Sequence, residues 1–344
     1  MSNDITPSVP ARAPPARGRA ATHIRAPSTR SPTLSRVLSR DVILKLECLQ
    51  PSGSFKLRGV AHAMTRAISR DGVTSFVSSS GGNAGLACAY AAEALGVSAE
   101  VFVPLTTPER TREMLRAFGA SVVATGERWI DAHEKATERC AEASDGEKRA
   151  LIHPFEGEDL WLGHSTMIDE LAEDFAKDNV GEPAAIVLSV GGGGLLAGVL
   201  LGVERAGWMK TRVVAVETIG AACLYESVRA RTVVTLKEIT SVAKSLGASS
   251  PSRVVFDKVM ALGDARVASR VCEDADAVRA CVRFADDHRL LVEPACGAAL
   301  AACYFPELRL LEGLEGDGPI VVIVCGGAVV DRKSLDELER RALA

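Results

Sequence analysis

Residues 184–200 restrict the fold of this chain more than any other segment. Residues 184–190 (AAIVLSV) form a continuous apolar run, which is typical of a strand buried on both faces of a parallel sheet. Four consecutive glycines follow at 191–194, and a helical pattern begins at Leu195. A strand, a glycine turn and a helix N-terminus in this order favour a site where backbone N–H groups bind phosphate.

The same segment permits a second interpretation. Gly192, Gly194 and Ala197 satisfy a dinucleotide-binding pattern, and Glu217 ends a later apolar run at about the expected distance. On these residues alone the chain could be an NAD-dependent oxidoreductase. A membrane span over the uncharged residues 184–203 is disfavoured, because four glycines in mid-span would destabilise the helix.

Lys56 stands in a turn rich in Gly, Ser and Pro, directly after Phe55. A lysine held on a rigid turn among apolar neighbours can stay uncharged, because burial disfavours its ammonium form. Such an amine can bond covalently to a carbonyl compound. The alternative is an ordinary surface lysine at the start of a helix.

Residues 78–85 (SSSGGNAG) follow a short apolar run and precede a helical pattern. Hydroxyl groups, an amide and free backbone N–H groups at a helix N-terminus can bind an anion, either a carboxylate or a phosphate. The alternative is a plain loop of small polar residues.

The 344 residues suffice for two domains, and the net charge of −4 with both signs interspersed indicates no nucleic-acid partner. The nine cysteines include no C-x-x-C pair, so we expect reduced thiols in a cytoplasmic protein rather than disulfides or a zinc site. Residues 1–21 are rich in Pro, Arg and Ala and predict a disordered tail; a mitochondrial transit peptide is the less favoured alternative.

Short apolar runs alternate with helical patterns from Asp41 onward, which predicts an α/β fold with mostly parallel sheets. Strands are expected near residues 42–46, 99–104, 119–124, 184–190, 213–216 and 319–324. A helix is expected to begin after Thr107, with that residue as N-cap and Pro108 in the first turn. The glycine-rich turns lie far apart in sequence, which favours a site between two α/β lobes.

From about His23 onward the chain resembles the serine/threonine dehydratases of the pyridoxal-phosphate (PLP) β-family, the fold type II or tryptophan synthase β-like enzymes. Four motifs occur in the family's order: residues 54–59 (SFKLRG), 79–85 (SSGGNAG), 191–194 (GGGG) and 324–327 (VCGG). The joining segments 153–155 (HPF), 239–244 (ITSVAK) and 293–299 (EPACGAA) are similar to animal-type L-serine dehydratases. The resemblance implies two α/β lobes with PLP between them.

The resemblance also implies roles for individual residues. Lys56 would bind PLP covalently and act as the catalytic base. Phe55 would lie against the pyridine ring, Asn83 would bind the ring hydroxyl, and Cys325 would face the ring nitrogen. Backbone N–H groups would hold the phosphate, from Gly191, Gly192, Gly193, Gly194 and Leu195. The substrate carboxylate would be bound by Ser80, Gly81, Asn83 and Ala84. A monovalent cation, usually potassium, would be bound by Glu217 and the carbonyl groups of Ala221, Leu246 and Ala248.

The implied reaction is β-elimination, which converts L-serine to pyruvate and ammonia and L-threonine to 2-oxobutanoate and ammonia. The alternative within PLP chemistry is a synthase in which a nucleophile captures the same aminoacrylate. A thiol at Cys325 supplies no charge to the ring nitrogen, so we expect a weak electron sink, suited to elimination.

The expected organisation is a disordered tail over 1–21, a large PLP-binding domain over 22–54 and 156–344, and a small substrate-binding domain over 55–155. The enzyme is expected to be a cytoplasmic homodimer without a membrane partner. Gly81 departs from the alanine that the more active animal enzymes commonly carry, which leaves turnover and the preference between serine and threonine open.

Overall fold

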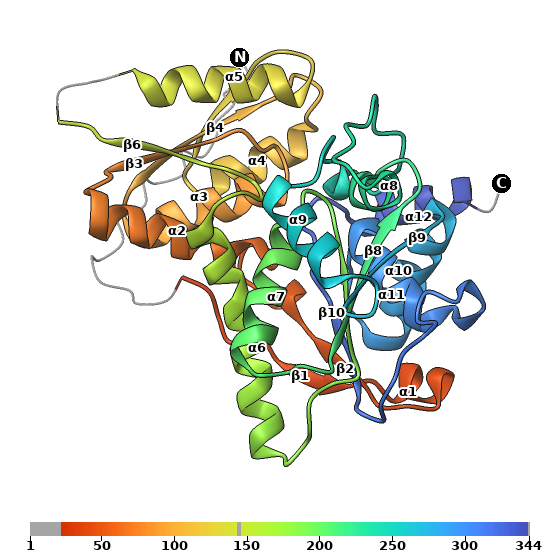
Figure 1. Ribbon diagram of the computed structural model, residues 1–344. Helices are drawn as coiled ribbons and strands as arrows, with labels where there is room; N and C mark the ends of the chain where they lie inside the picture. Colours follow the sequence, from red (N-terminus) through yellow and green to blue (C-terminus); the bar gives the residue numbers. More distant parts are fainter. Residues whose placement is uncertain (1–21, 143–145, 343–344) are drawn as a thin grey trace, which may run out of the picture.

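The computed structural model of the protein describes residues 22–142 and 146–342 (Figure 1). The tail predicted over residues 1–21 lies outside the described residues. Within the described part, no helix is both long and apolar enough to cross a membrane.

The strands form two separate sheets. The larger sheet has the order β1-β2-β10-β7-β8-β9, and only its edge pair β1–β2 is antiparallel. The smaller sheet has the order β5-β4-β3-β6 and is entirely parallel. The strands of the larger sheet are β1 (Ser28–Arg30), β2 (Val42–Lys45), β7 (Ala185–Ser189), β8 (Arg212–Thr218), β9 (Val267–Cys272) and β10 (Ile320–Ile323). Those of the smaller sheet are β3 (Ser75–Ser78), β4 (Ser98–Val103), β5 (Ser121–Ala124) and β6 (Arg149–Ile152).

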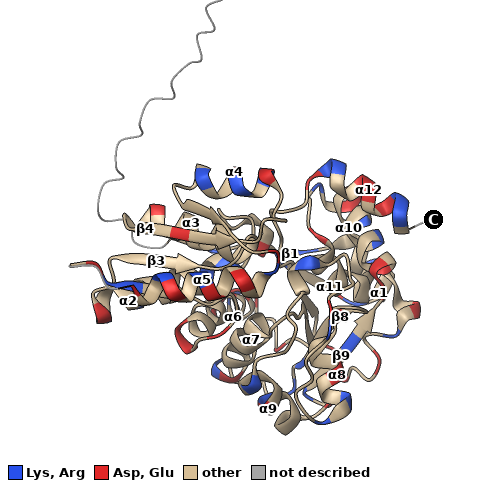
Figure 2. Ribbon diagram, turned by 90° about the horizontal axis from the view of Figure 1, so that it is seen from above, with Lys and Arg blue, Asp and Glu red and all other residues tan. Residues whose placement is uncertain are grey.

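Helices cover both sheets. They are α1 (Pro32–Leu38), α2 (Lys56–Asp71), α3 (Asn83–Leu95), α4 (Glu109–Ala117), α5 (Trp129–Ala141), α6 (Glu158–Lys177), α7 (Gly194–Arg205), α8 (Cys223–Ala230), α9 (Arg253–Leu262), α10 (Asp274–His288), α11 (Pro294–Tyr304) and α12 (Arg332–Ala342). Short 3-10 turns occur at η1 (Glu47–Leu49), η2 (Lys244–Leu246) and η3 (Pro306–Leu308). Charged residues concentrate on outer helices such as α4, α5 and α12, whereas α7 and α11 are largely free of them (Figure 2).

The core of the larger sheet is built from strands buried on both faces. Every residue of β7, β8 and β10 is buried, as expected for strands made mostly of Val, Ile, Leu and Ala. On one face α11 contacts β7, β8, β9 and β10, and α10 packs outside it. All residues of α11 are buried, which agrees with a helix that is apolar on every side.

Helix α2 connects the two halves of the molecule. It packs against α3 beside the smaller sheet and against α6 beside the larger one. The α2–α6 crossing is close, because a Cβ on Gly163 would lie 2.6 Å from the carbonyl oxygen of Arg58. The first turn of α2, which begins at Lys56, is therefore fixed by contacts to both halves.

The elements expected from the sequence agree with the structure to within a few residues, with one correction. Thr107 is not the N-cap of α4. The helix begins at Glu109, because Pro108 has an extended backbone (ψ 141°) and itself occupies the N-cap. The side chain of Thr107 lies instead beside Gly81.

Candidate active site

The turns at the carboxyl ends of four strands carry the predicted site residues. In the larger sheet, β7 precedes the glycine turn and β10 precedes Cys325. In the smaller sheet, β3 precedes residues 79–82 and β6 precedes residues 153–155. Contacts between these turns, such as the hydrogen bond from the N–H of Ala328 to Asn83, join the two sheets. Ligands of open parallel sheets bind at this edge, so the fold assembles the separated sequence motifs into one place.

Lys56 lies at the first position of α2, and its ammonium group faces the backbone of the β6–α6 connection. Its Nζ donates a hydrogen bond to the carbonyl oxygen of Pro154, 2.5 Å away. The Nζ also lies 5.2 Å from the centre of the Phe55 ring. Burial lowers the pKa of Lys56 to about 8, although Cys325 and Glu293 oppose the shift. The buried amine is therefore uncharged far more often near neutral pH than an exposed lysine is, which suits a nucleophile or a base.

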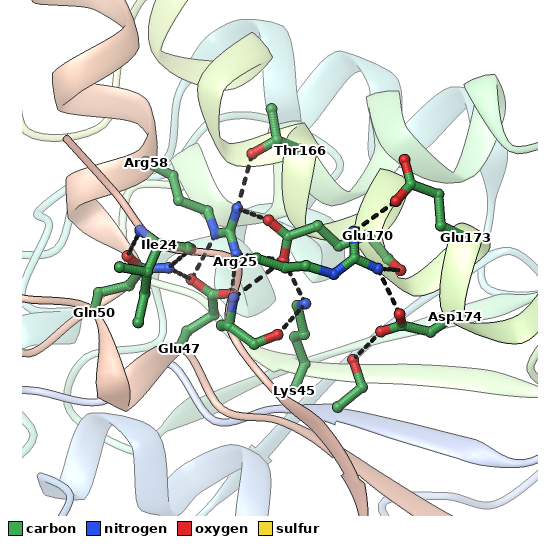
Figure 3. A network of polar contacts seen from close by, with 12 residues as sticks. Ile24, Arg25, Lys45, Glu47, Gln50, Arg58, Thr166, Glu170, Glu173 and Asp174 are labelled. Carbon is green, nitrogen blue, oxygen red and sulfur yellow. Dashed lines mark hydrogen bonds and ion pairs between the residues drawn. The ribbon is translucent and has the colours of Figure 1, made fainter. Parts of the chain in front are cut away.

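A buried ionic network holds Arg58, which lies two residues after Lys56 in the first turn of α2 (Figure 3). The guanidinium group of Arg58 forms two hydrogen bonds with Glu47, at 2.7 and 2.9 Å, and two with Glu170, at 2.8 and 2.7 Å. Lys45 donates to the same carboxylate of Glu170 at 2.6 Å. The side chains of Arg58, Glu47 and Lys45 are fully buried.

The network is balanced and extends to the chain segment before β1. Two basic groups (Lys45, Arg58) meet two acidic groups (Glu47, Glu170), so each of these four charges has a partner of opposite sign. The backbone N–H of Ala26 also donates to Glu170. The sequence motif identified Arg58 but gave no signal for Glu47 or Glu170, because ion pairs over such sequence separations leave no local pattern.

Residues 153–155 contact both Lys56 and the glycine turn. The Phe155 ring lies against Gly192 so closely that a Cβ there would overlap it, and a Cβ on Gly194 would be 2.8 Å from the Phe155 carbonyl oxygen. Gly193 has φ +98° and stands at the N-cap of α7. Only glycine fits these positions, which leaves the first N–H groups of α7 bare of side chains.

The ring of His153 turns its Nδ1 inward and accepts hydrogen bonds from the backbone N–H groups of Phe155 (3.2 Å) and Glu156 (2.9 Å). Burial, with His133 and Lys56 nearby, lowers the pKa of His153 to about 4. His153 is therefore neutral at physiological pH and holds the shape of the turn. The sequence comparison singled out residues 153–155 without a role, and these contacts supply one.

The predicted substrate loop follows β3 and ends at the N-terminus of α3, which begins with Asn83. Ser80 accepts a hydrogen bond from the N–H of Gly82 at 3.3 Å. The buried Ser79 hydroxyl lies 2.9 Å from Nδ1 of His133 on α5. His133 was not predicted, and its distance in sequence from the loop explains why.

Asn83 is buried, and its amide is held from three directions. Its Nδ2 donates to Oε1 of Glu293 at 2.7 Å and to the Ser245 hydroxyl at 3.3 Å, and its Oδ1 accepts from the N–H of Ala328 at 3.0 Å. These contacts connect the smaller sheet's loop with the turn after β10. Glu293 lies within a motif quoted from the sequence, but its side chain was not predicted to belong to the site.

Cys325 follows β10 and is buried beside the Lys56 turn. Its carbonyl oxygen accepts a hydrogen bond from the N–H of Phe55 at 3.1 Å. A hydrogen bond with Cys296 and burial both raise the pKa of the Cys325 thiol. The thiol is therefore protonated and uncharged at neutral pH, as the sequence argument requires.

Glu217, at the end of β8, is fully buried. Its two carboxylate oxygens accept hydrogen bonds from the N–H groups of Leu224 (2.9 Å) and Tyr225 (2.7 Å) in the first turn of α8. Burial raises its pKa to about 8. A dinucleotide-binding site needs an accessible acidic residue that binds the ribose. Because the Glu217 carboxyl group is enclosed, it cannot fill this role, which argues against the dinucleotide interpretation.

The other residues predicted to bind a cation lie in the turn after β8 and in and after the 3-10 turn η2. The carbonyl oxygen of Leu246 lies 3.2 Å from the position of a Cβ on Gly191, so these two backbones approach closely. Ala221 is buried after β8, and the N–H of Ala248 donates to Leu246.

Comparison with known proteins decides the family. A family model described as "Pyridoxal-phosphate dependent enzyme" matches residues 21–326. The chain belongs to this family. It is 41% identical over 324 residues to human "L-serine dehydratase/L-threonine deaminase", covering 93% of this chain and 95% of that protein. It is 40% identical over 298 residues to "L-serine dehydratase" of Saccharomyces cerevisiae (strain AWRI1631), covering 83% and 87%. The fungal L-serine ammonia-lyase structure from Rhizomucor miehei superposes with a TM-score of 0.85 at 34% identity, covering 93% of this chain and 99% of that one.

These findings confirm the predicted PLP-dependent family and its fold, an α/β arrangement with mostly parallel sheets. The residues also fit the cofactor. The glycine turn at the N-terminus of α7 is a cradle that any side chain would fill, which suits a phosphate group. The buried Oε2 of Glu293 and the buried hydroxyl of Ser54 have no hydrogen-bond partner among the described residues and can meet polar atoms of a bound group.

Proposed function

We propose that this chain is an L-serine/L-threonine ammonia-lyase. It would convert L-serine to pyruvate and ammonia, and L-threonine to 2-oxobutanoate and ammonia. The main support for this proposal is Lys56, whose pKa is lowered by burial. Its Nζ donates a hydrogen bond to the carbonyl oxygen of Pro154, which lies beside the glycine turn. The printed activities of the human, yeast and fungal relatives support the same assignment.

The residues that would hold PLP come from both halves. Lys56 would bind it covalently, Gly191 to Gly194 and the N–H of Leu195 would hold its phosphate, and Phe55 would cover one face of its ring. Asn83 and Cys325 would meet the ring hydroxyl and the ring nitrogen. When bound, PLP supplies an electron sink for the charge that develops at the substrate α-carbon.

The chain's own groups supply the proton transfers. With the substrate held on the cofactor, the Lys56 amine would be free and uncharged, and its Nζ would remove the substrate α-proton. The Pro154 carbonyl oxygen accepts one N–H of that amine, so the lone pair is left to face the substrate. The neutral thiol of Cys325 leaves the ring nitrogen without a fixed positive charge, which favours loss of the β-hydroxyl over long-lived carbanion chemistry.

The substrate carboxylate would lie on the loop formed by Ser80, Gly81, Asn83 and Ala84. Helix α3 begins at Asn83, so the N–H groups of its first turn add a partial positive charge there. His133 fixes this loop from outside through the Ser79 hydroxyl.

Several finer features belong to the same proposal. The small substrate-binding domain would span 55–155 and the large PLP-binding domain 22–54 and 156–344, consistent with the two sheets. Potassium would bind Glu217 and the carbonyl oxygens of Ala221, Leu246 and Ala248, because hard cations prefer oxygen ligands. The family resemblance favours a homodimer in the cytoplasm.

The test is to purify the protein with PLP and record its absorption before and after adding L-serine, while keto acid and ammonia are assayed. Lys56→Ala is the control. We expect a visible band from the lysine-bound cofactor, equal amounts of pyruvate and ammonia, and loss of both in the variant. A band without keto acid, but with a new product when a thiol is added, would favour a β-replacement synthase. The absence of any band with added PLP would overturn the assignment.

A further inference from the structure

Glu293 is a buried carboxyl group inside the site that the proposed reaction leaves without a task. It stands at the N-cap of α11 with only 3% of its surface exposed. A buried glutamate without an arginine or lysine salt-bridge partner is unusual, because burying a charge is costly. We therefore expect the Glu293 carboxyl group to have a function in the site.

One oxygen of Glu293 fixes the orientation of Asn83. Oε1 accepts the Asn83 Nδ2 hydrogen bond at 2.7 Å, while the N–H of Ala328 holds the amide oxygen at 3.0 Å. Because an amide can rotate by half a turn with little change in shape, both contacts are needed to define which end faces the site. Removing Glu293 would leave only the Ala328 contact and the long bond to Ser245.

The other oxygen of Glu293 has no partner. Oε2 is completely buried and forms no hydrogen bond in the described structure. It lies against Gly327, where even a Cβ would overlap the carboxyl group, so the backbone leaves no room for the group to turn away. A buried oxygen without a partner costs free energy, and it marks a place where a ligand atom completes the hydrogen bonding.

The ionisable groups around Glu293 decide its charge. Burial raises its pKa to about 7, while hydrogen bonding from the Ser245 and Asn83 side chains, and then the positive charge of Lys56, act in the opposite direction. Cys325 and Cys281 are the neighbouring thiols, and both have raised pKa values. When Lys56 is bonded to a cofactor it no longer carries the ammonium charge, so the carboxyl group then favours its protonated form at neutral pH.

We propose that Glu293 is a positioning residue of the cofactor pocket, which fixes the Asn83 amide through Oε1 and presents a protonated Oε2 to the acidic ring oxygen of the bound cofactor. This inference rests on the proposed function, because it requires a cofactor bonded to Lys56.

The test compares Glu293→Gln, Glu293→Ala and the wild-type holoenzyme, with Glu100→Gln as matched control. Glu100 lies on β4 and forms a partly exposed ion pair with Arg139 of α5. PLP affinity is measured by titrating the apoprotein, and the absorption band of the holoenzyme is recorded from pH 6 to 9. Far-UV circular dichroism and thermal unfolding check that each variant is folded.

We expect Glu293→Ala to weaken PLP binding about tenfold or more, since a hydrogen bond and its orienting effect are lost. Glutamine keeps the acceptor for Asn83 and a donor at the second position, so Glu293→Gln should stay within about threefold of wild type. The wild-type and Glu100→Gln bands should change with pH near neutrality, and this change should be absent in both Glu293 variants.

Two results would overturn the inference: unchanged PLP affinity in Glu293→Ala, or a neutral-pH spectral change that persists in both Glu293 variants. If Glu293→Ala fails to fold, the pH response of Glu293→Gln decides. A wild-type protein that shows no lysine-bound band would instead reject the proposed function, so the two failures are distinguishable.

Discussion

Arg58 and Glu170 form a buried ion pair with two parallel hydrogen bonds, and this pair joins the helix that carries Lys56 to α6 beside the larger sheet. The guanidinium group is completely buried and also meets Glu47. Because Arg58 lies less than one helical turn after Lys56, the pair fixes the backbone from which the reactive amine extends. The ionic network thus links stability and active-site geometry.

Arg58→Met should strongly destabilise the protein. It leaves the carboxylates of Glu47 and Glu170 buried without their main partner, which costs about 3–5 kcal/mol. Urea unfolding of the holoenzyme would measure the change. The control is Arg205→Met, whose exposed pair with Asp169 should contribute at most about 1 kcal/mol. A similar loss of unfolding free energy in both variants would show that the buried network contributes no more to stability than an exposed ion pair.

Gly81 and Thr107 should behave as a coupled pair. A Cβ on Gly81 would lie 2.7 Å from the Thr107 hydroxyl and 2.9 Å from its methyl group, so Gly81→Ala forces one of the two segments to move. Overpacking of this kind costs about 1–3 kcal/mol, and here it also displaces the substrate loop. We expect Gly81→Ala to lower kcat/KM for L-serine.

The double variant Gly81→Ala/Thr107→Ala tests this coupling. Alanine at 107 removes both atoms that would clash, so the double variant should regain most of the activity and stability lost in Gly81→Ala. A double-mutant cycle would give a coupling energy of about 1 kcal/mol or more. Additive effects of the two substitutions would contradict the contact.

Much of the fold, and the turns that carry the candidate site residues, could be predicted from sequence, because each of those features is local. The strand-glycine-helix pattern at 184–200 and the turn before Lys56 both depend on neighbouring residues. Partners brought together by tertiary folding could not be predicted. Glu293 meets Asn83 across 210 positions, and Arg58 meets Glu170 across 112.

The misplaced N-cap has a similar physical reason. Thr107 followed by proline has the composition of a helix start, yet the side chain is used to fill the space beside Gly81. The N-cap preference of Thr107 was therefore overridden by a tertiary packing contact, which cannot be recognised from the sequence.

Lys56→Met should stabilise the apoprotein at pH 7 and lose that advantage at high pH. The folded-state pKa of Lys56 is about 8, below the ordinary value of 10.5, so burial of the ammonium group destabilises the folded state below pH 8. Between about pH 8 and 10.5 the unfolded chain binds more protons, so wild-type stability rises with pH relative to the variant. The difference in unfolding free energy, about 1–3 kcal/mol at pH 7, should shrink toward pH 10. An exposed control, Lys135→Met, should show no such trend, and a constant difference for Lys56→Met would contradict the shift.

Potassium should stabilise the wild-type protein through Glu217. Without a cation, burial raises the folded-state pKa of this carboxyl group to about 8, so the folded state loses stability as pH rises from 4.5 toward 8. A bound cation offsets this loss by pairing with the carboxylate.

Replacing potassium with tetramethylammonium at constant ionic strength should therefore lower the Tm at pH 8 more than at pH 5. The expected effect is about 1.4 kcal/mol for each tenfold excess of potassium over its Kd. Glu217→Ala should remove the dependence on potassium, whereas Glu182→Ala, at a half-buried glutamate before the start of β7, should retain it. Equal potassium responses in wild type and Glu217→Ala would place the cation elsewhere.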